Sequence, residues 1–251
     1  MTHSNLSVFA LSSREFAIWL GCAALAVFFA LGDIGFIGAL AREDHFVENL
    51  TALFFVSGAG LCLWFIRDAS YRLAKIGWIF LCLLFAGEET SWLQRVFDYS
   101  VPAVEQMNYQ REFNLHNLDI LGGHIRVQDQ AAVEDHTGWV RIIKKHLHSQ
   151  NLFNLGFFTY FLVLPILLWR GSLKFLQKKL DIPAFNPAFV AMVWACVGVT
   201  IVFTLMMEPE TVRRHYMLEL REVYMSLAIL IHIFSFAIPA KDRKLGQGPG
   251  R

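Results

Sequence analysis

Two adjacent glutamates, Glu88 and Glu89, end an apolar run in the stretch GEETSWLQR, residues 87–95. Paired carboxylates can serve as general acid and general base, or bind a divalent cation. Trp92 and Arg95 follow Glu88 by four and seven residues, which places all three on one face of a helix. The stretch therefore predicts a polar site at one end of a hydrophobic helix, with Glu88, Glu89 and Arg95 as catalytic candidates.

Three further segments place carboxylates and imidazoles four residues apart. The pairs are Asp44 and Glu48, Glu112 and His116, and His215 and Glu219. Residues at i and i+4 share a helix face, and metal sites in helical bundles are built from such pairs on neighbouring helices. The types of ligand favour Zn²⁺ or another divalent metal. The candidate metal ligands are His116, His215, Glu48 and Glu219, and Asp44 is a further catalytic candidate.

Amide and aromatic side chains accompany these candidates. Asn114 and Asn117 flank His116, and Glu112 precedes it by one helical turn. Such groups can orient a substrate, or they can cap turns. Trp92 is also typical of an aromatic residue at a membrane surface. A structural alternative stays open, in which the acids are solvated helix ends or pair with arginines to hold a loop to the bundle.

Other ionisable residues lie deeper in apolar blocks. Asp33 falls inside the first block, and an acid within a membrane span is a functional hypothesis because it is costly there. His232 falls deep in the last block, where a hydrogen-bonded core histidine is favoured over a ligand. The four cysteines all lie within apolar blocks without a Cys-x-x-Cys pair, which indicates small core residues and no disulfide framework.

The elements that must position these residues are long apolar segments. Hydrophobic residues make up 55% of the 251-residue chain and charged residues 17%, against about 25% charged in soluble domains. Six apolar blocks cover about residues 15–40, 47–66, 74–91, 152–169, 187–207 and 219–238. Each approaches the roughly 20 residues that a bilayer-spanning helix requires. The sequence therefore predicts an all-α, polytopic membrane helix bundle with about six transmembrane helices in a single domain, residues 1–251.

Two other segments complete the predicted organisation. Residues 92–150 form a long polar connection, predicted to be an extracytoplasmic loop that caps the bundle between the third and fourth spans. Residues 241–251 are predicted to be a disordered cytoplasmic tail. The Ala-x-Ala step at residues 39–41 resembles a signal-peptidase site, but the preceding apolar stretch exceeds the usual length of about 7–15 residues, so a retained first span is favoured.

Charge distribution predicts the orientation. The short connections RDASYR and WRGSLKFLQKK and the tail KDRK concentrate basic residues on one side, and most acids fall on the other. The positive-inside rule then places both termini in the cytoplasm and the polar clusters at the outer face. We expect a protein of the bacterial inner membrane, in contact with the lipid bilayer. The net charge of +1 predicts no nucleic-acid partner.

Three stretches together carry a resemblance: REDHFVENLTALFF, GEETSWLQR and NYQREFNLHNL. They are similar to a family of bacterial multi-pass inner-membrane proteins with the motifs E-D-x-x-x-E-x-x-T-A, G-E-E-x-S-W-x-Q-R and N-x-Q-x-E-x-N-L-H-N. The resemblance covers roughly the first half of the chain. It implies a multi-pass membrane fold and no particular reaction.

A weaker resemblance is to the alkaline-ceramidase-like membrane hydrolases. That resemblance implies a zinc held by histidines near one end of a seven-helix bundle, beside an acid and a serine. This chain shares the acidic opening before a span and an outer polar cluster. It departs from the family in its six predicted spans and in lacking the paired histidines of the last spans, where only His215 and His232 are present.

Three functions follow from the sequence. The first is a metal-dependent membrane hydrolase that acts at the outer leaflet on a lipid or lipid-linked substrate. The second is a non-enzymatic accessory or binding subunit in envelope biogenesis, with the long loop as the docking surface for a protein partner. The third is an ion- or proton-coupled transporter, with Asp33, the glutamate pair and His232 as relay groups.

Overall fold

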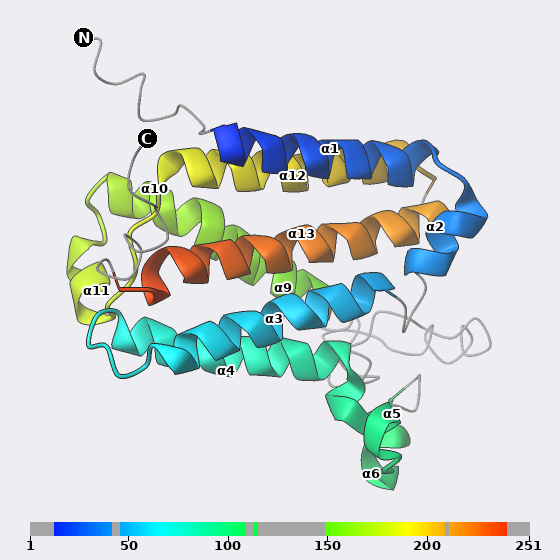
Figure 1. Cartoon of the computed structure of the whole chain (residues 1–251), viewed down its shortest axis with the longest axis horizontal. Helices are drawn as coiled ribbons and strands as arrows, with labels where there is room; N and C mark the ends of the chain where they lie inside the picture. The colour runs from blue at the N-terminus through cyan, green and yellow to red at the C-terminus, as the bar shows by residue number, and fades with distance from the viewer. Residues whose placement is uncertain (1–12, 42–45, 109–112, 115–148, 209–210, 240–251) are drawn as a thin grey trace, which may run out of the picture.

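The computed structural model describes residues 13–41, 46–108, 113–114, 149–208 and 211–239 (Figure 1). The longest helices are α1 (Ser13–Leu31), α3 (Phe46–Trp64), α4 (Arg72–Glu89), α12 (Pro187–Met206) and α13 (Val212–Ala237). The shorter elements are α2 (Ile34–Ala41), η3 (Ser91–Leu93), α5 (Gln94–Phe97), α6 (Pro102–Glu105), α9 (Ser149–Phe158), η5 (Thr159–Val163), α10 (Leu164–Trp169) and α11 (Lys174–Lys179). These described residues form helices and no strands, so the all-α prediction is confirmed for them.

Four helical segments are long and apolar enough to cross a membrane. They are Ile34–Trp64, Asn151–Trp169, Pro187–Met206 and Val212–Ala237. The coarser prediction of a helical membrane protein is therefore supported, and the number of six spans remains a prediction. The apolar part of α1, Phe16–Leu31, is shorter. Helix α4 has 18 residues, but charged side chains occupy both of its ends, and it is not among these four segments.

The sequence pattern predicted one continuous helix for the first apolar block. The structure instead divides this block into α1 and α2. The chain turns after Leu31, and α2 packs against α3 and α13. Asp33 lies in the turn and is exposed, and its Oδ1 accepts a hydrogen bond from the backbone N–H of Phe36 at 2.8 Å. The placement of Asp33 within a span is therefore wrong. The residue satisfies a free N–H group at the start of α2 instead.

An arginine on α13 holds the end of α1. Nη1 of Arg213 donates to the carbonyl oxygens of Phe29 and Ala30, both at 3.1 Å, and Nη2 donates to that of Gly32 at 3.0 Å. These carbonyls lack partners within their own helix, and a cation at a helix C-terminus also offsets the helix dipole. Arg213 thereby joins two segments more than 180 residues apart.

Helix α13 lies at the centre of the bundle. Its neighbours are α3, α12 and α1, with axes roughly parallel to its own (Figure 1). Met217, Leu220 and Ile233 on α13 are almost fully buried. By contrast, large apolar side chains such as Phe80 and Leu63 are exposed on α4 and α3, as expected where helices face lipid.

At the opposite end of the bundle, a lysine on α4 binds the chain that follows α3, as Arg213 binds the end of α1. Lys75 is fully buried, and its Nζ donates to the carbonyl oxygen of Phe65 at 2.9 Å and lies 3.6 Å from Oδ2 of Asp68. The lysine therefore satisfies the chain just beyond the end of α3, because a buried ammonium requires partners. The four cysteines are free thiols within the helices, as predicted.

Candidate functional site

Five glutamates from three helices gather at one end of the bundle. Glu89, the last residue of α4, interacts electrostatically with each of the other four. Their positions are Glu48 on α3, Glu88 on α4, and Glu219 and Glu222 on α13. We call these five residues the acidic cluster. The structure thus brings together four of the predicted site residues, Glu48, Glu88, Glu89 and Glu219.

Helix stability does not explain the position of Glu88 and Glu89. Both close α4, and a helix C-terminus carries a partial negative charge that favours cations over carboxylates. Glu48 differs, because it lies in the first turn of α3, where a negative charge is favourable. All three side chains are partly buried. Carboxylates so placed repel one another unless they share protons or a bound cation.

The edge of the cluster is open to solvent. Nε2 of His215 lies 3.6 Å from Oε1 of Glu219, and the two side chains are 50% and 22% exposed. Both belong to the first turns of α13, where they share a face. His215 is therefore the accessible imidazole of the site, and Glu219 links it to the partly buried carboxylates.

Arg221 is a site residue that the sequence reasoning missed. It lies between Glu219 and Glu222 in the chain and interacts electrostatically with Glu222. Its Nε is buried and has no hydrogen-bond partner among the residues that the structure describes. Buried guanidinium groups usually have their donors satisfied. The sequence does contain a feature that points to Arg221, since an arginine within an apolar helix is unusual.

The motif after α4 reverses the chain sharply. Ser91, Trp92 and Leu93 all have positive φ angles, of 46°, 53° and 63°. The turn returns the indole of Trp92 to α4, where its Nε1 donates to Oε1 of Glu88 at 2.8 Å. A Cβ atom on Gly87 would lie 2.8 Å from the indole ring, so a larger residue at this position would force the indole to move. The motif therefore fixes the side chain of Glu88.

Further motif residues hydrogen-bond to one another beyond this turn. Nδ2 of Asn108 donates to Oδ1 of Asn114 at 2.8 Å, and Nδ2 of Asn114 donates to Oγ of Ser91 at 3.3 Å. Gln94 donates to Glu105 at 3.0 Å and accepts from the backbone N–H of Phe113 at 2.6 Å. We call Ser91, Gln94, Glu105, Asn108 and Asn114 the polar clip. Asn114, a predicted substrate or structural residue, is 2% exposed and serves a structural role here.

Several predicted site residues lie outside the described part of the chain. They are Asp44, Glu112, His116 and Asn117, with the side chain of Arg95. Most of the predicted loop 92–150 and the predicted tail 241–251 also lie outside it. Their assigned roles remain predictions.

The predicted metal site is incompletely represented. Among the described residues, no group of three or more His, Cys, Asp or Glu side chains is arranged to hold a metal ion. The close pair His215 and Glu219 offers an imidazole and a carboxylate, the types of ligand that zinc prefers. Glu48, another predicted ligand, interacts electrostatically with Glu89 of the acidic cluster. His116 lies outside the described residues.

Comparisons with known proteins assign no family. No family model, curated protein or solved structure matches the chain. The resemblances drawn from the sequence motifs therefore remain predictions, and the function must be argued from the site itself.

His232 does not belong to the acidic cluster. It is 1% exposed, its Nε2 lies 3.0 Å from the hydroxyl oxygen of Tyr160, and its ring stacks on Phe185 with centroids 4.7 Å apart. This agrees with the prediction of a hydrogen-bonded core histidine. The partners of His232 are thus Tyr160 and Phe185 rather than the carboxylates, so they lend no support to a relay between them.

Proposed function

We propose that the protein is an integral membrane hydrolase of the bacterial inner membrane, with its active site at the outer ends of α3, α4 and α13. The substrate class is a lipid or lipid-linked molecule, since the site lies near the start of α13, a helix long and apolar enough to cross a membrane. The acidic cluster supplies the reactive groups. The observation that carries the proposal is that Glu89 is partly buried and interacts electrostatically with four carboxylates from three helices.

Such a cluster suits acid–base hydrolysis. Neighbouring carboxyl groups whose charges repel hold protons unequally, so one can donate a proton to a leaving group while another accepts one from water. Glu89 is the natural proton donor, because four other carboxylates disfavour its charged form. Glu88 is fixed by the indole of Trp92 and is the candidate base. Arg221 and His215 balance the charge of the substrate and of the cluster.

A divalent cation is the expected cofactor. His215 and Glu219 would hold it, with Glu48 and the predicted ligand His116 completing the set. When bound, Zn²⁺ or a similar cation activates a coordinated water and neutralises the carboxylates. The protein residues still have to orient the substrate and exclude competing water.

The test compares two glutamate variants of purified protein in nanodiscs made from bacterial lipid extract. Lipid products are followed by mass spectrometry, and bound metals by elemental analysis. We expect Glu89→Gln to lower turnover by at least about 100-fold, the usual contribution of a general acid. Glu208→Gln, which changes an exposed acid outside the cluster near the same end, is the matched control. Equal turnover of both variants and the parent would overturn the proposal.

A second candidate is an accessory subunit in envelope biogenesis, and the polar clip favours it. Residues of the two sequence motifs hydrogen-bond to one another, which supports a role for these motifs in shaping a surface beyond α4. Affinity purification distinguishes the two functions. A stoichiometric envelope protein retained by the parent and by Glu89→Gln, with no lipid turnover, would support the accessory function.

A further inference from the structure

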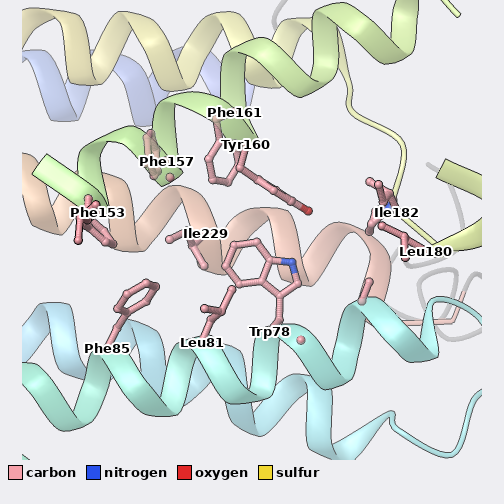
Figure 2. A pocket seen from close by; sticks show the side chains of 15 residues that line it. Trp78, Leu81, Phe85, Phe153, Phe157, Tyr160, Phe161, Leu180, Ile182 and Ile229 are labelled. Carbon is pink, nitrogen blue, oxygen red and sulfur yellow. The ribbon is translucent and has the colours of Figure 1, made fainter. Parts of the chain in front are cut away.

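An elongated apolar groove runs along α4 on the side that faces α9 and η5 (Figure 2). Its volume is about 530 Å³, within the range of small-molecule sites. Apolar and aromatic side chains from α4, α9 and α13 line it, among them Leu81, Phe85, Phe153, Phe157 and Ile229. The groove is separate from the acidic cluster, none of whose residues line it.

The dimensions of the groove match one leaflet of a membrane. Its lining on α4 extends from Ala74 to Phe85, which is about 16 Å of helix at 1.5 Å per residue. Half of a hydrocarbon core is about 15 Å thick. Since one wall of the groove is formed by Asn151–Trp169, a segment long and apolar enough to cross a membrane, the material available to fill the groove is an acyl chain.

Among the residues that line the groove, two have polar side-chain atoms. The hydroxyl oxygen of Tyr160 and the indole nitrogen of Trp78 lie on the side toward Leu180 and Ile182 (Figure 2). Tyr160 belongs to the π-helix η5, a departure from α-helical geometry that is frequent at functional sites. Its hydroxyl group is held by Nε2 of His232 at 3.0 Å. This end can thus bind a polar group of an otherwise apolar ligand.

Basic residues stand beside the same end. Helix α11 carries Lys174, Lys178 and Lys179, all exposed, and leads directly into Leu180, which lines the groove. Basic pockets next to apolar grooves between helices attract anionic lipid headgroups. We propose that the groove binds an anionic glycerophospholipid, with its phosphate at the lysines of α11 and one acyl chain along α4 toward Phe85.

Two glycines allow a direct test. Gly77 and Gly156 line the groove, and a Cβ atom on either would meet nothing within 4 Å. Gly156→Leu therefore fills the groove without a backbone clash. Gly60→Leu is the matched control, because Gly60 is equally open and lies outside the groove.

The probe is phosphatidylglycerol with a photoactivatable diazirine at the end of one acyl chain, in nanodiscs with the full chain. Digestion and mass spectrometry locate the crosslinks. We expect labelling of α4 near Phe85 and of α9 near Phe153. Gly156→Leu should reduce this labelling about tenfold, as loss of a few buried methylene contacts would, and Gly60→Leu should leave it unchanged.

The headgroup is tested separately. Replacing Lys178 and Lys179 together by glutamine should lower labelling by phosphatidylglycerol and leave labelling by the phosphatidylcholine analogue unchanged. Equal labelling by the two lipids in the parent protein would overturn the anionic headgroup. Labelling spread over exposed helices such as α3, or unaltered in Gly156→Leu, would overturn the groove itself. Neither result bears on the hydrolase proposal, because the groove shares no residue with the acidic cluster.

Discussion

At the scale of single residues, the most informative feature is the position of two glutamates at a helix end where their charge lowers the stability of the fold. Glu88 and Glu89 end a helix where carboxylates are disfavoured, and three more carboxylates lie near Glu89. Residues kept against stability are common at functional sites, where activity and stability compete. The acidic cluster should therefore respond to substitution differently from the polar clip.

Removing one carboxyl group from the cluster should stabilise the fold. We expect Glu89→Gln to raise the free energy of unfolding by roughly 0.5–2 kcal/mol, the usual gain at such sites, because the folded state no longer has to hold a carboxyl group in its protonated form beside four other carboxylates. Thermal unfolding in detergent with a metal chelator measures this gain. The control is Glu208→Gln. A loss of stability specific to Glu89→Gln would show that the carboxylate has a structural partner.

The turn after α4 makes the opposite prediction. Gly87→Ala adds a methyl group that would lie 2.8 Å from the indole ring of Trp92. Such overpacking costs about 1–3 kcal/mol, so the melting temperature should fall. Gly60→Ala, at an open position, is the comparison and should leave stability nearly unchanged. An unchanged melting temperature for Gly87→Ala would mean that the indole does not pack there.

At the scale of elements, one side chain decides where α1 stops. Arg213 satisfies three carbonyl groups of the turn between α1 and α2. In Arg213→Gln, the backbone amides of residues 32–37 should exchange with deuterium faster than in the parent, because the turn loses its anchor. The neighbouring Arg214→Gln should have little effect. Hydrogen exchange in nanodiscs, followed by mass spectrometry, reads out both variants.

The helices themselves were largely predictable from hydropathy, and their ends were not. The blocks 47–66, 74–91 and 187–207 correspond closely to α3, α4 and α12. Helix α13 begins at Val212 because Thr211 caps it by accepting from the N–H of Arg214 at 3.3 Å, and the charged first turns carry no apolar signal. The break at Asp33 was missed because apolar residues continue on both sides of a single capping residue.

The candidate site shows the same limit. Spacing identified Glu48, Glu88, Glu89 and Glu219 as residues for one end of the bundle, but it could not show that Glu89 lies close enough to interact electrostatically with the others. That proximity depends on α13 lying beside α3 and α4, which no local pattern encodes. Nor could spacing separate Asn114, a structural residue, from the carboxylates, because amides suit both roles.

At the scale of the whole molecule, the two ends of the bundle differ in charge. Acids lie at the end formed by the start of α13, and lysines of α11 lie at the other. The charge distribution predicts that the acidic end is extracytoplasmic. Ser70→Cys and Gln106→Cys test this, since both positions are exposed, in the α3–α4 connection and after α6. In intact cells an impermeant maleimide should label only Gln106→Cys, and the reverse pattern would invert the topology.

Burial is also unequal across the bundle. Of an apolar 18-residue stretch within Asn151–Trp169, 22% is buried, compared with 61% of the corresponding stretch within Val212–Ala237. Since local stability follows the contacts that an opening breaks, α9, η5 and α10 should detach while α13 stays folded. The helices α9, η5 and α10, which carry Tyr160, would then move relative to α13. Lateral pressure of the bilayer on these helices would help to keep them packed against the rest of the bundle.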